Sequence, residues 1–207
     1  MTKIKVAVVD DHAVVRMGLK YALALFKDMV FVGEHSDGEG AVEFVRKTSP
    51  DVTLLDIRMP GKDGVTALGE IRKALPEAKV IMLTTSGTEE DVYRSLNLGA
   101  RGYVLKDRDP QLIVDAIRKV AAGGKYVPDE VKAVYDSRSQ APELTPREHE
   151  TLTLLAQGLS NREIALRLGV SEDGAKIHLK HVYDKLEAKD RVDAIAIALR
   201  RGLVAAP

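Results

Sequence analysis

The sequence predicts an α/β domain built on a doubly wound parallel sheet, followed by a smaller all-α domain. Over residues 1–122, short runs rich in β-branched residues alternate five times with longer segments whose apolar residues recur at helical spacing. This alternation is typical of consecutive βα units, whose right-handed crossovers place helices on both faces of a parallel sheet. Residues 144–207 carry helical spacing without a strand pattern, which indicates a separate helical domain.

The elements follow in order along the chain. Strands are expected over residues 4–9, 30–33, 52–55, 80–83 and 102–105. Helices are expected near residues 13–26, 39–48, 64–74, 89–98 and 109–122, and in the second domain near 146–157, 161–168, 172–186 and 190–201. Between the domains, the pair Gly123-Gly124 ends the alternation. Residues 123–143 then indicate a linker that holds a short helix near 129–136.

Composition and charge narrow the class of protein. The 207 residues include 31 basic and 31 acidic side chains, so a nucleic-acid or membrane partner must be argued from local residues. The chain has no cysteine, which excludes disulfides, thiol nucleophiles and Cys-ligated zinc. No apolar run reaches the ~18 residues that span a bilayer, and Asp10 and Asp11 interrupt the start before a signal peptide forms. A cytoplasmic protein with no membrane partner is therefore expected.

Polar residues gather where the predicted strands end. Asp10 and Asp11 follow the first strand and Asp56 follows the third, so three carboxylates converge if these strands are neighbours. Carboxylates this close raise one another's proton affinity unless a cation lies between them, and oxygen ligands favour Mg²⁺. The fourth strand ends at Thr84 and the fifth runs into Lys106, so a hydroxyl and an ammonium join the same edge.

These residue types suit phosphoryl transfer to a carboxylate. Asp56 stands alone at its strand end before a turn and is the expected nucleophile, while Asp10 and Asp11 are the expected metal ligands. Mg²⁺ and Lys106 would neutralise the phosphoryl oxygens, and the Thr84 hydroxyl would donate a hydrogen bond to one of them. The alternative is that each acidic residue is only a solvated loop residue.

The first domain also carries motifs of a known family. They are Asp10-Asp11, Asp56 with Met59-Pro60 and Gly64, Thr84, and Gly102-Tyr103-Val104-Leu105-Lys106. Over about residues 3–122 the chain resembles the receiver domain of two-component response regulators. The resemblance implies a flavodoxin-like (βα)5 fold with a parallel five-stranded sheet. It implies that Asp56 accepts a phosphoryl group from a sensor histidine kinase, and that Mg²⁺ binds to Asp11, Asp56 and the carbonyl of Arg58, with Asp10 assisting. It also implies that Thr84 moves toward the phosphoryl group and that Tyr103 changes rotamer.

The helical domain contains a candidate helix-turn-helix. Gly169 lies in a short turn between two predicted helices, and Ser171 is a suitable N-cap for the second of them. One apolar stripe of this second helix should face the core, while Lys176, Ile177 and Lys180 point elsewhere. An exposed isoleucine with two lysines suits a helix that reads the major groove of double-stranded DNA, and a solvated basic face is the alternative. The stripe comprises Ala175, Leu179, Val182 and Leu186.

A second set of motifs resembles the LuxR-type helix-turn-helix domain of the NarL/FixJ regulators, over about residues 144–200. The set comprises Leu144-Thr145-Pro146-Arg147-Glu148, the run from Gly158 to Ala165, Ser171, Lys176, His178, Lys185-Leu186 and Arg191. The resemblance implies that Lys176, Ile177 and Lys180 face the major groove, with His178 near the DNA backbone. It also implies that two copies pair through an apolar stripe as a homodimer on a two-fold site. Packing of this stripe into the core is an equal alternative. That stripe lies on the last helix and comprises Val192, Ile195 and Leu199.

Two residues depart from the LuxR-type pattern, because Gly174-Ala175 stand where the family usually has Thr-Val. Glycine weakens a helix by ~1 kcal/mol relative to alanine, and the missing hydroxyl removes one candidate phosphate contact. Weaker or differently specified DNA binding is therefore expected.

The sequence as a whole predicts a two-component response regulator, in which phosphorylation at Asp56 controls dimerisation and sequence-specific DNA binding and thereby transcription. No enzymatic activity is expected beyond this self-phosphorylation. One alternative is a receiver-containing interaction protein with weakened or lost DNA binding. A less favoured alternative is an aspartate-based, Mg-dependent phosphohydrolase, because Arg58 stands where such enzymes usually have a second aspartate.

Overall fold

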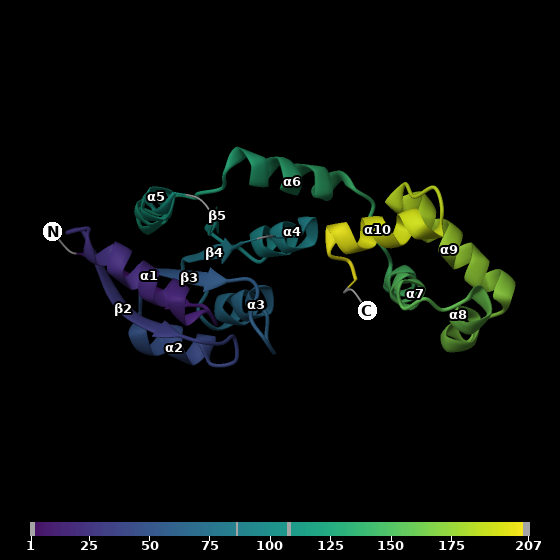
Figure 1. Ribbon diagram of the computed structural model, residues 1–207, viewed down its shortest axis with the longest axis horizontal. Helices are drawn as coiled ribbons and strands as arrows, with labels where there is room; N and C mark the ends of the chain where they lie inside the picture. The colour runs from purple at the N-terminus through teal and green to yellow at the C-terminus, as the bar shows by residue number, and fades with distance from the viewer. Residues whose placement is uncertain (1–2, 86, 107–108, 205–207) are drawn as a thin grey trace. The chain divides into compact units, whose positions relative to one another are not determined.

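The computed structural model describes residues 3–85, 87–106 and 109–204 and divides into two compact units (Figure 1). The first unit comprises residues 1–87 and 91–135, and the second comprises residues 88–90 and 136–207. Among the described residues, no helix is both long enough and apolar enough to cross a membrane.

The first unit is built around a sheet of five parallel strands in the order β2-β1-β3-β4-β5. The strands are β1 (Ile4–Val9), β2 (Met29–His35), β3 (Val52–Asp56), β4 (Val80–Thr84) and β5 (Gly102–Leu105). The order of strand addition reverses at β1, since β2 lies on one side of it and all later strands lie on the other. In open sheets of this kind, ligands bind beyond the carboxyl ends of the strands at such a switch point.

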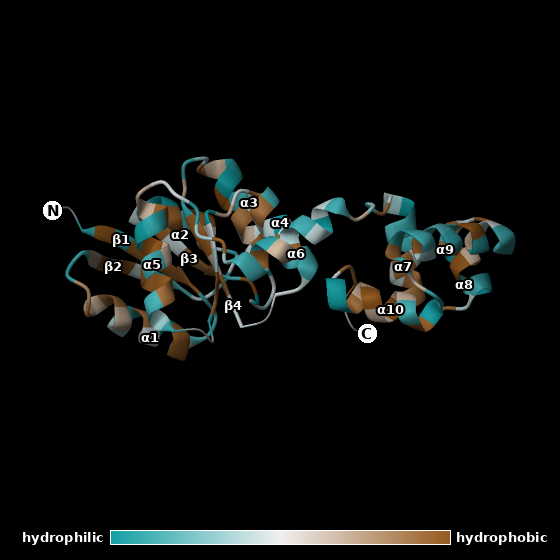
Figure 2. Ribbon diagram, turned by 90° about the horizontal axis from the view of Figure 1, so that it is seen from above, coloured by the Kyte–Doolittle hydropathy of each residue, from teal (hydrophilic) through white to brown (hydrophobic). Residues whose placement is uncertain are grey.

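Helices cover both faces of the sheet. One face packs against α1 (Ala13–Ala24) and α5 (Pro110–Ala121). The other face packs against α2 (Ala41–Thr48), α3 (Gly64–Ala74) and α4 (Glu89–Asn97). Because both faces are covered, the central strands are apolar along their length, as Figure 2 shows by their brown colour.

The segment after α5 extends the edge of the sheet. Tyr126 forms a parallel bridge with Gly102, donating its N–H to the carbonyl of Arg101 and accepting from the N–H of Tyr103, both at 2.9 Å. This pairing satisfies backbone groups on the outer side of β5. Helix α6 (Asp129–Gln140) follows and buries Val131 against the core of the first unit. The expected linker helix is present and extends beyond residue 136.

The second unit contains α7 (Pro146–Ala156), α8 (Asn161–Leu168), α9 (Glu172–Leu186) and α10 (Arg191–Arg201). Local capping fixes where the first two begin, because Thr145 and Ser160 form capping boxes with Glu148 and Glu163. The four helices share a core of aliphatic side chains. The predicted stripe of α9 is part of this core, which confirms that Ala175, Leu179, Val182 and Leu186 face inward.

The fold class predicted from the sequence is confirmed, and so is the type of each expected element. The bounds differ only at the ends. For example, the strand expected over residues 30–33 extends over Met29–His35, because its pairing with β1 continues to His35.

Candidate functional site

Three carboxylates meet at the switch point of the sheet. Val9 of β1 is in register with Leu55 of β3, so Asp10 and Asp56 follow at neighbouring strand ends. Asp10 and Asp56 are buried and Asp11 is partly exposed. The sequence predicted that the three carboxylates converge if β1 and β3 are neighbours. The two strands are neighbours, and the carboxylates lie close together.

Backbone and side-chain contacts hold the loop after β1 in place. The N–H of His12 donates to Oδ1 of Asp10 at 2.8 Å. Arg16, one turn into α1, donates from Nη1 to the carbonyls of Asp10 and Asp11 at 2.7 and 3.1 Å. These contacts fix the backbone of Asp10 and Asp11 against the start of α1.

Lys106 bridges the two buried carboxylates. Its Nζ lies 2.7 Å from Oδ2 of Asp10 and 2.7 Å from Oδ2 of Asp56. Burial raises the pKa of the Asp56 carboxyl, and the charge of Asp10 adds to the rise, although Lys106 and the N–H of Arg58 oppose it. The site therefore holds more negative charge than its one buried ammonium balances, which is the electrostatic condition for binding a further cation.

The turn after β3 packs tightly against the end of that strand. The N–H of Arg58 donates to Oδ1 of Asp56 at 3.2 Å, and the N–H of Gly64 donates to the carbonyl of Ile57 at 2.9 Å. A β-carbon at position 64 would collide with the backbone of Asp56 and Ile57, so only glycine fits there. The side chain of Asp63 caps α3 by accepting from the N–H of Thr66 at 2.7 Å.

The donor set fits a hard divalent cation. Asp10, Asp11, His12 and Asp56 each offer one ligand atom, and these atoms lie within 4.8 Å of one another. Three of the four donors are carboxylates, the ligands that Mg²⁺ prefers. His12 was not singled out from the sequence. Its Nδ1 lies 2.7 Å from Oδ1 of Asp11 because the ring folds back over the carboxylates, and sequence spacing carries no sign of this.

Two further predicted residues lie on β4 and β5. Thr84 is buried at the end of β4, and its carbonyl accepts from the N–H of Lys106 at 2.7 Å. Tyr103 is buried in β5, and its hydroxyl has no hydrogen-bond partner among the described residues. Burial raises the pKa of Tyr103, and the charge of Asp91 adds to the rise while Arg58 opposes it. The Tyr103 hydroxyl therefore lies within electrostatic reach of both side chains.

In the second unit, the predicted groove-facing residues lie on the outer side of α9. Ile177 is 56% exposed, and Lys176 and Lys180 are exposed as well, whereas His178 is half-buried. Lys176 pairs with Oδ1 of Asp173 at 3.0 Å, and this hydrogen bond raises its pKa. Ile177 is one of the few large apolar side chains that the described part of this unit leaves in solvent.

Two contacts that sequence spacing did not reveal hold helices of the second unit together. Lys185 of α9 pairs with Oε2 of the buried Glu148 at 2.7 Å. Arg191 donates from Nη2 to the carbonyls of Leu155 and Leu159 at 3.2 and 2.7 Å. Lys185 and Arg191 both belong to the motifs that resemble LuxR-type domains, and each ties two helices of the second unit together.

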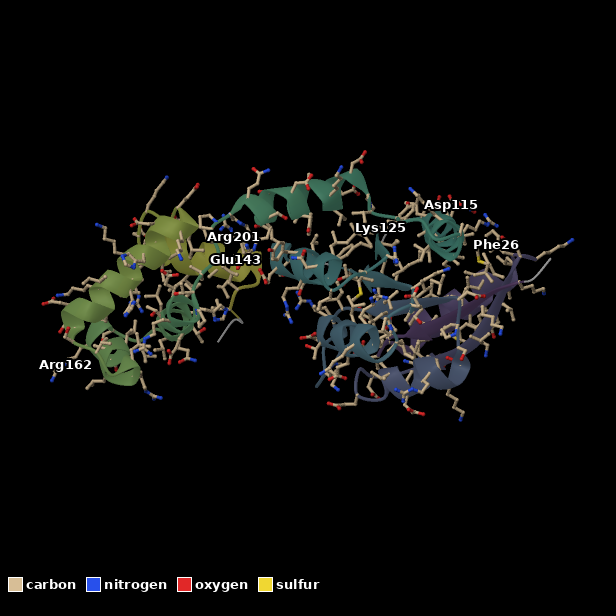
Figure 3. All side chains as sticks on the ribbon, turned by 180° about the vertical axis from the view of Figure 1, so that it is seen from behind. Phe26, Asp115, Lys125, Glu143, Arg162 and Arg201 are labelled. Carbon is tan, nitrogen blue, oxygen red and sulfur yellow. The ribbon has the colours of Figure 1, made fainter. Side chains whose placement is uncertain are left out.

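Helices α8 and α10 carry further exposed side chains of the second unit. Val192 is exposed and Ile195 and Leu199 are half-buried, so the predicted dimerisation stripe lies along the less buried side of α10. On α8, the side chain of Arg162 is exposed and projects outward from the helix (Figure 3).

Comparison with known proteins agrees with this arrangement. Residues 6–118 match the response regulator receiver domain family, and residues 142–198 match the LuxR family of bacterial regulatory proteins. The uncharacterized transcriptional regulatory protein YxjL of Bacillus subtilis is 38% identical, and the match covers 98% of this chain and 98% of YxjL. The nitrate/nitrite response regulator protein NarL of Escherichia coli is 36% identical, over 91% of this chain and 92% of NarL.

A solved structure is also similar over the whole length. RcsB from Salmonella enterica serovar Typhimurium, bound to promoter P1flhDC in the presence of the phosphomimetic BeF3-, is 26% identical with a TM-score of 0.75. The match covers 97% of this chain and 100% of that one. Together, the fold, the acidic cluster and these matches show that the chain belongs to the two-component response regulators that join a receiver domain to a LuxR-type DNA-binding domain.

Proposed function

We propose that this protein is a cytoplasmic transcription regulator whose DNA binding is controlled by phosphorylation of Asp56. The observation that carries the proposal is the position of Asp56, buried at the end of β3 with Lys106 on one carboxylate oxygen and the N–H of Arg58 on the other. A buried carboxylate with an adjacent ammonium and further carboxylates matches what an acyl-phosphate site requires.

The reaction assigned to the site is the transfer of one phosphoryl group to Asp56. An oxygen of the Asp56 carboxylate attacks the phosphorus of a phosphohistidine in a sensor histidine kinase, the phosphorus–nitrogen bond breaks, and the new phosphorus–oxygen bond remains on Asp56. Lys106 is placed to neutralise the phosphoryl oxygens, and the hydroxyl of Thr84 to donate to one of them. Asp10, Asp11, Asp56 and the carbonyl of Arg58 would hold Mg²⁺, which supplies positive charge to the transferred group when it is bound. No turnover of a separate substrate is assigned to the chain.

A surface on α1 suits the kinase. Val14, Met17, Tyr21 and Leu25 are all exposed, and they recur at the spacing of one helix face. The helix begins directly after Asp11 and His12, so a partner that brings a phosphohistidine to Asp56 is in reach of this face. We call these four residues the α1 surface and assign it to kinase docking.

The output of the regulator is DNA binding, and we assign it to α9. This helix would enter the major groove of double-stranded DNA, with Ile177, Lys176 and Lys180 contacting bases and phosphates. His178 is placed near the DNA backbone. Two copies would pair through Val192, Ile195 and Leu199 of α10, giving a homodimer on a two-fold site. The DNA-bound RcsB structure supports this assignment by its similarity over nearly the whole chain.

A receiver-containing interaction protein with lost DNA binding is the second candidate, and Gly174 favours it. A β-carbon at this position would lie 3.3 Å from Oγ of Ser171 and 3.3 Å from Cβ of Val170, closer than ordinary contact. The first turn of α9 is therefore tight at this position, so the threonine that LuxR-type domains usually have would require Ser171 and Val170 to move by a few tenths of an ångström. The phosphohydrolase reading has no comparable support, and hydrolysis of small phosphoesters is the measurement that tests it.

The deciding experiment measures how much of a fragmented genomic DNA pool the purified protein retains, with Mg²⁺ and a small phosphodonor present or absent. Wild type and Asp56→Asn are compared, with Asp115→Asn on the surface of α5 as the control for loss of an exposed carboxylate. Selective retention that rises with phosphodonor in wild type and in Asp115→Asn, but not in Asp56→Asn, supports the proposal. Retention of DNA that ignores the phosphodonor contradicts the switch, and no retention under any condition favours the second candidate.

A further inference from the structure

Arg58 makes one contact on each side of the loop that follows the phosphoacceptor. Its backbone N–H donates to Oδ1 of Asp56 at 3.2 Å, while its guanidinium forms an ion pair with Oδ2 of Asp91. Asp91 lies in the first turn of α4, and its side chain is 13% exposed, whereas that of Arg58 is 54% exposed. Partial shielding from water strengthens such a pair relative to one at the open surface. The loop beside Asp56 is thereby fastened to α4.

Helix α4 contacts α6 on another side. Successive residues of a helix are rotated by about 100°, so Tyr93 and Asn97 share one face and lie roughly 200–240° around the helix from Asp91. On that second face, the ring of Tyr93 stacks on Tyr135 with centroids 5.8 Å apart. The hydroxyl of Tyr135 also donates to Oδ1 of Asn97 at 2.9 Å. Tyr135 belongs to α6, so one helix separates the phosphoacceptor loop from the linker helix.

We propose that Arg58 is a positioning residue for output, which transmits the charge on Asp56 through Asp91 and α4 to Tyr135 of α6. This inference rests on the proposed phosphorylation of Asp56. A phosphoryl group adds negative charge and strong acceptor oxygens beside the backbone of Arg58. The guanidinium then has a second anion to pair with, and its pairing with Asp91 weakens. Helix α4 loses its fastening to the loop, and the contacts of Tyr93 and Asn97 carry that change to α6.

Tyr103 supplies a replacement partner for Asp91. Its hydroxyl is buried without a hydrogen-bond partner among the described residues and is sensitive to the charges of both Asp91 and Arg58. A buried hydroxyl left unpaired is costly, so its donation to Asp91 becomes favourable once the guanidinium withdraws. Asp91 would thus exchange one donor for another, and α4 would have two defined positions.

The test measures hydrogen exchange of residues 129–140 in the full chain, before and after phosphorylation by a small phosphodonor with Mg²⁺, with phosphoryl content read from intact mass. The variants are Asp91→Asn, which removes the ion pair, and Tyr135→Phe, which removes the bond to Asn97. Asp115→Asn is the control, because it neutralises an exposed carboxylate of the same unit away from α4.

In wild type and Asp115→Asn, phosphorylation should change the exchange of α6. In Asp91→Asn, exchange without phosphodonor should already be shifted toward the phosphorylated wild-type value, and the further change on phosphorylation should be lost. Tyr135→Phe should show a reduced response at the same phosphoryl content, and combining it with Asp91→Asn should add nothing.

Two outcomes overturn the inference alone. One is phosphorylated wild type with unchanged exchange in α6, and the other is Asp91→Asn with a wild-type response. If wild type gains no phosphoryl mass, the proposed function itself fails and the relay fails with it. The mass measurement therefore separates the two failures.

Discussion

The Nζ of Lys106 lies 2.7 Å from Oδ2 of Asp56, so the proposed nucleophile is paired before any phosphoryl group arrives. This pairing opposes the rise in pKa that burial imposes on the Asp56 carboxyl. It also places a positive charge where the phosphoryl oxygens would be. Both effects act in the same direction, toward a carboxylate that is ionised and able to attack.

Replacement of Lys106 should therefore slow phosphorylation in a way that depends on pH. In Lys106→Gln, the pKa of Asp56 should rise further, so the rate should begin to fall at a higher pH as the solution is made acidic, since only the ionised carboxylate attacks. Loss of one stabilising donor should lower the rate at neutral pH by about 10²-fold. The measurement is phosphoryl incorporation from a small phosphodonor across a pH series. Lys47→Gln, an exposed lysine of α2, is the control, and an unchanged profile in Lys106→Gln would contradict the assignment.

The α1 surface gives a prediction that separates docking from chemistry. Tyr21→Glu places a charge among exposed apolar side chains and should slow phosphotransfer from a sensor kinase that phosphorylates the wild type, by about tenfold or more. Phosphorylation by a small phosphodonor should be unchanged, because Tyr21 touches none of the carboxylates. Leu166→Glu, an exposed leucine of the second unit, should affect neither rate. Equal slowing with both phosphodonors would show that Tyr21→Glu acts on the fold instead.

The Glu148–Lys185 pair predicts how the second unit responds to pH. Burial disfavours the charged carboxylate of Glu148, but the bond from Lys185 and those at Thr145 outweigh it, so its pKa lies below the ordinary value of 4.5. A lowered folded-state pKa contributes stability that is fully present above about pH 4.5 and is lost as pH falls through the folded-state value. Glu148→Gln should lower the free energy of unfolding of this unit by about 1.5–3 kcal/mol at neutral pH and remove that acid dependence. Urea unfolding read by hydrogen exchange in α7 and α9 measures it, with the exposed Glu187→Gln expected to change little.

Much of the site was predictable because its residues follow strands. The β-branched runs locate the strand ends, and a parallel sheet brings all carboxyl ends to one edge, so Asp10, Asp56 and Lys106 were expected at the same edge. That they touch depends on the strand order, which places β1 beside β3. The buried stripe of α9 was predictable for a similar reason, since helical periodicity alone decides which side is apolar.

The missed contacts depend on side chains that reach across elements. Arg58 meets Asp91 from a different element, and nothing in the spacing of the two marks them as partners. The pairing of Glu148 with Lys185 likewise joins α7 to α9, and the bridge of Tyr126 to Gly102 depends on where the chain turns after α5. Local patterns specify elements and faces, whereas these contacts require the elements to be already in place.

Two exposed lysines of α9 differ in their pairing with carboxylates. Lys180 has no ion pair among the residues the structure describes, while Lys176 is held by Asp173 at 3.0 Å. Lys180→Ala should therefore weaken binding to all sequences and reduce the slope of log affinity against log salt by about 1. Asp173→Asn should do the opposite and strengthen binding, because it removes a negative charge from the helix start and leaves Lys176 with only the longer pair to Glu172, at 3.8 Å. Ile177→Ala should instead reduce discrimination between sequences with little change in the salt slope.

Mobility shifts at several salt concentrations, with a retained genomic fragment and a scrambled one, distinguish these effects. Asp184→Asn neutralises an exposed carboxylate near the other end of α9 and serves as the matched control for Asp173→Asn. If both substitutions strengthen binding equally, the gain comes from net charge alone, since Asp173 pairs with Lys176 and Asp184 does not. A larger gain at position 173 would instead mean that α9 carries its DNA contacts in a restrained form, with Asp173 withholding Lys176 until a phosphate competes for it.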